Sequence, residues 1–172
     1  CCRILRRNID RMGYTGSFTI YDSSDSERQM KEVLKDMGLD DKTFPPKYVL
    51  SVIGRQKDRL ISPEEMLENS RGSSDLRLTQ IAKAYAAYQK RLKDNNALDF
   101  DDILYITVKL LQQEPEVLSY YQNKFRYVLV DEYQDTNHLQ YLLTGLLAGG
   151  RKNLCVVGDD DQSIYRFRGA NI

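Results

Sequence analysis

Two adjacent carboxylates follow an apolar run in the last third of the chain. The run is residues 127–130, and Asp131 and Glu132 come directly after it. The Mg²⁺ of a nucleotide is a hard cation that keeps several waters, so one carboxylate often suffices to hold it. The neighbouring acid can then accept a proton from an attacking water. The pattern indicates a Walker B element, with Asp131 as the Mg²⁺ ligand and Glu132 as the base. An acid-rich turn at the end of a strand is the alternative.

A second polar cluster occupies residues 158–170, again after an apolar run. Gln162 offers both donor and acceptor groups, which suit contact with a γ-phosphate or with the attacking water. Tyr165 and Phe167 alternate with arginines, the last of which is Arg168. Aromatic faces stack on bases and arginines neutralise phosphates, so this stretch favours contact with a nucleic-acid strand. A surface turn with two aromatic side chains packed in the core is the other interpretation.

The sequence around these clusters predicts a scaffold that brings them together. Residues 127–130 and 154–157 are short apolar runs, and residues 139–147 between them have helical character. A strand, a helix and a strand at this spacing form a βαβ unit, whose strands pair in parallel with both faces buried. Chemistry in such sheets gathers at the carboxyl ends of the strands, where both clusters begin. Cys155 is expected to be a buried free thiol.

The first 125 residues are predicted to be mostly helical. Helices are expected over residues 1–12 and from about 76 to 93, with a short strand at residues 18–21. The predicted fold class is therefore α/β with a predominantly helical portion. Helix starts are marked by residues of capping type, namely Ser24, Ser62 and Asp99.

Composition favours a soluble, cytoplasmic protein. The apolar fraction of 41% can fill a core, and the charged fraction of 29% suits a solvated surface. No apolar run approaches the roughly 20 residues needed to span a bilayer, and no secretory signal is recognisable. The three cysteines and the single histidine lack zinc-ligand spacing, so neither a zinc site nor a disulfide framework is expected. The zero net charge does not by itself indicate a nucleic-acid partner.

The two clusters together resemble a known family. Residues 131–137 read DEYQDTN and residues 158–170 read GDDDQSIYRFRGA. Both strings are similar to motifs II and III of the superfamily 1 helicases of the UvrD/PcrA/Rep group. Residues 1–13 and the LDFDD string at residues 98–102 also resemble segments of that family.

The resemblance implies a partial RecA-like parallel sheet, of the P-loop NTPase type, together with an all-α insertion subdomain. By this resemblance, residues 1–23 belong to the motor domain and residues 24–98 to the helical insertion. Residues 99–172 then form the motor segment with Walker B (motif II) and motif III.

The same resemblance implies roles for individual residues. Asp131 would bind Mg²⁺ and Glu132 would be the catalytic base. Gln162 would contact the γ-phosphate of ATP and couple it to DNA. Many relatives carry tryptophan at position 167, where phenylalanine still stacks but offers less area and no N–H. The residues implied to contact DNA are Tyr165, Phe167 and Arg168.

The implied activity is that of an ATP-dependent DNA helicase with 3′-to-5′ polarity. Its ligands would be ATP, Mg²⁺, and single-stranded and partly duplex DNA. The phosphate-binding string Gly-x-x-x-x-Gly-Lys-Ser/Thr is not found in these 172 residues, so the isolated chain is expected to be inactive. Two alternatives are a non-catalytic module that binds DNA or protein, and a metal-dependent nuclease built on Asp131 and the acids at 159–161.

Overall fold

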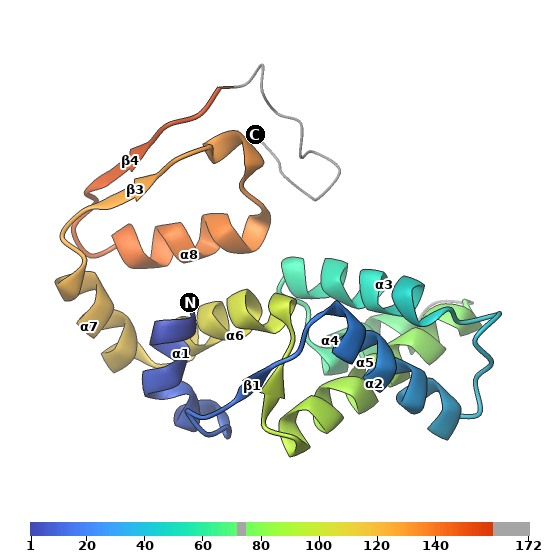
Figure 1. Cartoon of the computed structure of the whole chain (residues 1–172). Helices are drawn as coiled ribbons and strands as arrows, with labels where there is room; N and C mark the ends of the chain where they lie inside the picture. Colours follow the sequence, from blue (N-terminus) through green and yellow to red (C-terminus); the bar gives the residue numbers. More distant parts are fainter. Residues whose placement is uncertain (72–74, 160–172) are drawn as a thin grey trace.

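The computed structural model describes residues 1–71 and 75–159, which are mostly helical with short parallel strands. This agrees with the predicted helical first part and the short strands that follow it (Figure 1). In chain order the elements are α1 (Cys2–Asn8), η1 (Ile9–Met12), β1 (Thr19–Ile20), α2 (Ser23–Asp36), α3 (Pro46–Asp58), α4 (Pro63–Arg71), α5 (Leu76–Asp94), β2 (Ala97–Leu98), α6 (Phe100–Gln113), α7 (Pro115–Lys124), β3 (Val128–Val130), η2 (Tyr133–Asp135), α8 (His138–Ala148) and β4 (Leu154–Val156).

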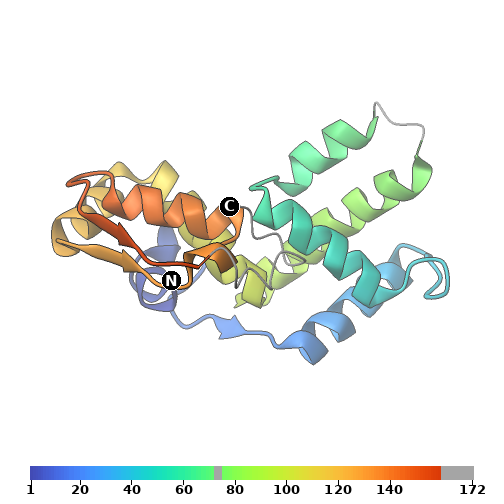
Figure 2. The same cartoon turned by 90° about the horizontal axis from the view of Figure 1, so that it is seen from above.

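Two hydrophobic cores organise the described residues. The first core joins α2, α3, α4 and α5, and its buried members run from Met30 to Ala97. The second core joins α1, η1, α6, α7 and α8, so it draws on both ends of the chain. Figure 2 shows the two groups of helices at opposite ends of the molecule, with α6 and β1 between them.

The helix starts follow local hydrogen-bonding signals, with one correction. Ser62 and Asp99 cap α4 and α6 as predicted, and each forms a reciprocal pair of bonds with the residue three positions later. The prediction that Ser24 caps α2 is wrong, because Asp22 is the cap. Asp22 Oδ1 accepts from the backbone N–H groups of Ser24 and Asp25, both at 2.8 Å. The Ser24 hydroxyl itself donates to this carboxylate, which is the stronger acceptor.

The α5 helix supplies the centre of the first core. Tyr85 and Tyr88 are fully buried there, which is where aromatic side chains contribute most packing area. Leu92 lies one turn further along the same face and is also buried. This confirms the predicted long helix near residues 76 to 93, whose apolar face holds α2, α3 and α4 together.

A short parallel pair of strands lies between the two cores. β1 pairs with β2 in the register Thr19 to Ala97 and Ile20 to Leu98. The strand at residues 18–21 is thus confirmed as a shorter element, whereas β2 was not predicted. β1 comes before α2 and β2 comes after α5. The pair therefore holds together the two ends of the segment that contains α2, α3, α4 and α5.

The β3–α8–β4 unit has the predicted parallel pairing. Val128 pairs with Leu154 and Val130 with Val156, and α8 lies along one face of the pair (Figure 1). The expectation that both faces are buried is wrong, as Leu129 retains 76% of its exposed area.

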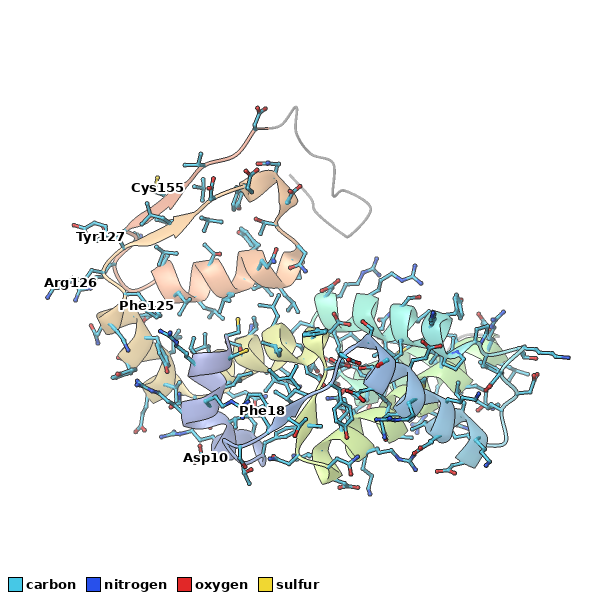
Figure 3. All side chains as sticks on the ribbon, in the orientation of Figure 1. Asp10, Phe18, Phe125, Arg126, Tyr127 and Cys155 are labelled. Atoms are coloured by element: carbon cyan, nitrogen blue, oxygen red, sulfur yellow. The ribbon has the colours of Figure 1, made fainter. Side chains whose placement is uncertain are left out.

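Cys155 is likewise exposed rather than buried. Figure 3 shows it on the side of the strands away from α8. In the described part of the chain, α8 packs on the opposite face of this two-stranded sheet, so it does not cover Cys155. Among the described residues, no helix combines the length and the hydropathy required to span a membrane.

Candidate functional site

Asp131 and Glu132 lie at the carboxyl end of β3, as predicted, and both side chains are exposed. The backbone of Glu132 has φ of +51° and ψ of +44°, the left-handed region that non-glycine residues enter rarely. This conformation turns the chain sharply from β3 into η2. Glu132 N donates to Asp131 Oδ1 at 3.0 Å, so the two acids are also joined through the backbone. Backbone strain of this kind is common at functional sites.

Gln134 holds the Glu132 side chain in place. Its Nε2 donates to Glu132 Oε2 at 2.6 Å, and its Oε1 accepts from Asp159 N at 2.9 Å. The Gln134 side chain is nearly fully buried. A buried amide with both ends satisfied is a rigid support, because either end would cost free energy if it were left unpaired. The amide therefore fixes the carboxylate of Glu132 relative to the end of the second strand.

The two strand ends are tied directly to each other. Val157 N donates to Val130 O at 2.8 Å, and Tyr133 N donates to Val157 O at 2.9 Å. Gly158 follows immediately and approaches Gln134 closely. A Cβ added to Gly158 would lie 2.7 Å from Gln134 Oε1, a contact that real Cβ atoms essentially never make. The second polar cluster thus starts beside the first, as predicted from the parallel pairing.

A pocket of about 380 Å³ opens beside the acids, between the end of β3 and the start of α8. Asp135 Oδ1 is buried next to it without a hydrogen-bond partner among the described residues. An acidic lining with an unpaired carboxylate oxygen fits a hard cation such as Mg²⁺, which prefers oxygen ligands and retains waters. The lining residues are Val130, Asp131, Glu132, Asp135, Thr136, Gln140, Leu143 and Thr144.

Among residues 1–71 and 75–159, no group of three or more His, Cys, Asp or Glu side chains could hold a metal ion alone. A nucleotide-bound Mg²⁺ does not require such a group, because phosphates and waters fill most of its coordination shell. One carboxylate at this pocket is therefore compatible with such an ion, and the acids that line it are Asp131, Glu132 and Asp135.

The predicted site residues divide into two sets. Asp131 and Glu132 lie together at the pocket. The others lie outside the described residues, so their roles stay predictions. These residues are Gln162, Tyr165, Phe167 and Arg168.

Gln134 was missed by the sequence reasoning. Its partners are Glu132, two positions earlier, and the backbone of Asp159, twenty-five positions later. The only sequence signal is an amide between two acids in a short turn, and this pattern is also typical of exposed loops.

A buried charged cluster connects α3 with α6 and so joins the two cores. Lys57 is completely buried, and its Nζ lies 2.8 Å from Asp99 Oδ2 and 2.8 Å from Asp102 Oδ1. Tyr88 and Gln89 add hydrogen bonds to the two carboxylates. A buried charge is tolerated when it is paired in this way, and removal of one partner is strongly destabilising.

The ionisation of this cluster follows from burial and from neighbouring charges. Burial disfavours charge on Lys57, but the two carboxylates raise its pKa well above the ordinary value. Burial, together with the neighbouring Asp99, raises the pKa of Asp102 to about 6. Burial would also raise the pKa of Asp99, yet Lys57 holds that pKa below its ordinary value. One lysine thus stabilises two carboxylates unequally, because the second carboxylate is repelled by the first.

Comparison with known proteins agrees with this arrangement. The model of the family described as UvrD/REP helicase N-terminal domain matches residues 1–172. A protein named ATP-dependent DNA helicase PcrA from Bacillus subtilis is 49% identical over 172 residues, which is 100% of this chain and 23% of that protein. Proteins of the same name from Staphylococcus epidermidis and Staphylococcus aureus are 48% identical over the same shares.

The chain therefore spans about a quarter of the length of these curated relatives. Since the family model matches every residue from 1 to 172, the chain belongs to the UvrD/REP helicase N-terminal domain family.

Proposed function

We propose that the whole protein containing this chain is an ATP-dependent DNA helicase with 3′-to-5′ polarity on single-stranded DNA. The observation that carries the proposal is the pair Asp131 and Glu132 at the end of β3, beside an acidic pocket. Family membership and the names of the PcrA relatives support the same activity. Because the phosphate-binding string is not in these 172 residues, we expect the chain to turn over no ATP by itself.

In this proposal Asp131 would hold the Mg²⁺ of a bound ATP, and the ion would supply positive charge to the phosphates. Glu132 would accept a proton from the attacking water. Gln134 would keep the Glu132 carboxylate aimed at that water, since its Nε2 is 2.6 Å from Glu132 Oε2. The hydrogen bond occupies only one of the two carboxylate oxygens, so the other oxygen is free to act as the base.

The two cores support the proposed division of the chain. Buried members of the first core lie between Met30 and Ala97, inside the range 24–98 proposed for the helical insertion. The second core combines residues from the ranges 1–23 and 99–172, as a motor domain interrupted by an insertion would. The parallel β3–α8–β4 unit is compatible with part of a RecA-like sheet.

The proposed DNA contacts rest on the sequence. Tyr165 and Phe167 would stack on single-stranded bases, and Arg168 would support the coupling between DNA and ATP. Gln162 would contact the γ-phosphate. Their segment begins at Gly158, which lies against Gln134 in the loop from Asp131 to Asn137, called the catalytic loop below.

The test is ATP turnover by the whole protein with and without single-stranded DNA. We expect DNA to stimulate turnover, and Glu132→Gln to lower kcat by about 10²-fold or more while nucleotide binding persists. Glu116→Gln makes the same chemical change at an exposed site on α7 and serves as the control. Turnover that survives Glu132→Gln unchanged would refute the proposed role of this acid.

A further inference from the structure

The last two residues of α3 connect the first core to the second. Lys57 contacts Asp99, the N-cap of α6, through its buried ammonium group. Asp58 contacts Asn137, the N-cap of α8, because Asp58 Oδ1 accepts from Asn137 Nδ2 at 3.2 Å. A single helix end in the first core therefore holds the starting points of two helices in the second.

The contact with Asn137 reaches the catalytic loop. Asn137 Oδ1 accepts from Gln140 N at 2.9 Å, and Asn137 N donates to Gln140 Oε1 at 3.0 Å. This reciprocal pair fixes the start of α8 and uses the amide oxygen of Asn137. The amide nitrogen is left for Asp58. Because the loop that begins at Asp131 ends at Asn137, the Asp58 contact links the far end of this loop to α3.

The surroundings of Asp58 strengthen the contact. The side chain is half-buried, and burial raises its pKa whereas the neighbouring His138 lowers it. Asp101 is a second charged neighbour of this carboxylate within the described residues. A hydrogen bond to a partly desolvated carboxylate is stronger than one in water and is more sensitive to the loss of its donor.

We propose that Asp58 is a positioning residue that couples the helical insertion to the catalytic loop through Asn137. This inference rests on the proposed function, because it assigns the loop from Asp131 to Asn137 to ATP hydrolysis. A shift of α3 would move the N-cap of α8 and, with it, the acids at the other end of the loop. A displacement of about 1 Å around a reacting group can lower the rate of the reaction by a large factor.

The test exchanges the two side chains in the whole protein. Asn137→Asp keeps the capping oxygen of α8 but replaces the N–H donor with an oxygen that repels Asp58. Asp58→Asn alone keeps an oxygen that can accept from Asn137. The two changes together reverse the direction of the hydrogen bond and restore it. We compare kcat and KM for ATP in the four proteins, together with Tm.

We expect Asn137→Asp to lower kcat by about ten-fold with little change in the KM for ATP. Asp58→Asn alone should stay within about two-fold of the original kcat, and the double variant should return to that range. Asp36→Asn removes the same charge from an exposed ion pair between α2 and α5 and should have no effect on kcat. Unchanged kcat in Asn137→Asp, or no recovery in the double variant, would overturn the proposal.

A second readout separates this inference from the proposed function. Amide hydrogen exchange at Asp135 and Thr136, whose N–H groups bond within the loop, reports its order directly. We expect faster exchange in Asn137→Asp and recovery in the double variant. If the original protein hydrolyses no ATP, the proposed function is wrong. Unchanged amide exchange across the four proteins would disprove the coupling, whether or not ATP is hydrolysed.

Discussion

Gln134 and Glu132 are joined by a hydrogen bond of 2.6 Å, in which Gln134 Nε2 donates to Glu132 Oε2. The opposite end of the same amide accepts from Asp159 N, so one buried side chain links both strand ends. Residues that orient a base without touching substrate are typical supports of an active site, and their loss lowers the rate more than it lowers binding.

We expect Gln134→Ala in the whole protein to lower kcat for ATP by about ten-fold, because the Glu132 carboxylate loses its fixed orientation. The KM for ATP should change little. Steady-state turnover measures both values. Gln113→Ala, at the exposed end of α6, is the matched control and should behave like the original protein. A Gln134→Ala variant with full kcat would contradict the orienting role.

Gly158 should be as sensitive as Gln134, for a steric reason. An added Cβ would lie 2.7 Å from Gln134 Oε1 and 3.3 Å from Gln134 N. Gly158→Ala is therefore expected to displace the Gln134 amide and to lower kcat to a similar degree. Residues that act through one contact give non-additive effects, so the double variant with Gln134→Ala should be little worse than either single change. Additive losses would show that Gly158 acts by another route.

Lys57→Met should destabilise the protein by about 3–5 kcal/mol, because two buried carboxylates lose their cation. Urea unfolding at two pH values measures the loss. Lys47→Met, an exposed lysine on the same helix, is the control and should change stability by no more than about 1 kcal/mol. A Lys57→Met variant as stable as the Lys47→Met control would show that the cluster is not a stabilising junction.

The stability lost in Lys57→Met should depend on pH. In the original protein the pKa of Asp102 is raised to about 6. Between the ordinary pKa of an aspartate and about pH 6, the folded state holds more protons than the unfolded state, so stability falls as the pH rises. Without Lys57 the pKa of Asp102 rises further, and the pKa of Asp99 is no longer held below its ordinary value. The folded state then holds more protons than the unfolded state over a wider pH range. The destabilisation by Lys57→Met should therefore be smaller at about pH 5 than at about pH 8. An equal loss at both values would contradict this charge assignment.

Local features of the fold could be predicted from the sequence. Ser62 and Asp99 cap their helices as predicted, because capping signals act within a few residues. The parallel strands could be predicted because apolar runs flank a helix. The prediction for Ser24 is wrong because the neighbouring carboxylate of Asp22 is a better acceptor.

Features that depend on distant residues could not be predicted in the same way. Gln134 bonds to a backbone group 25 residues away, and β1 pairs with β2 across the whole first core. Lys57 carries a usable signal, since it follows Val49 and Ile53 at helical spacing and therefore lies on the buried face of α3. A lysine on that face predicts buried acidic partners, although the pattern does not identify them.

Asp131 is proposed to bind the metal of the nucleotide, so a change at this residue should change which metal supports turnover. In the whole protein, Asp131→Cys replaces a hard oxygen ligand with a soft thiolate, which binds Mg²⁺ poorly and Cd²⁺ well. ATP turnover is measured with each metal, with Asp131→Ala as the control for cadmium bound at the exposed cysteines elsewhere. We expect Asp131→Cys to lose turnover with Mg²⁺ and to regain it with Cd²⁺, while Asp131→Ala stays inactive with both. Full Mg²⁺-supported turnover by Asp131→Cys would show that Asp131 is not the metal ligand.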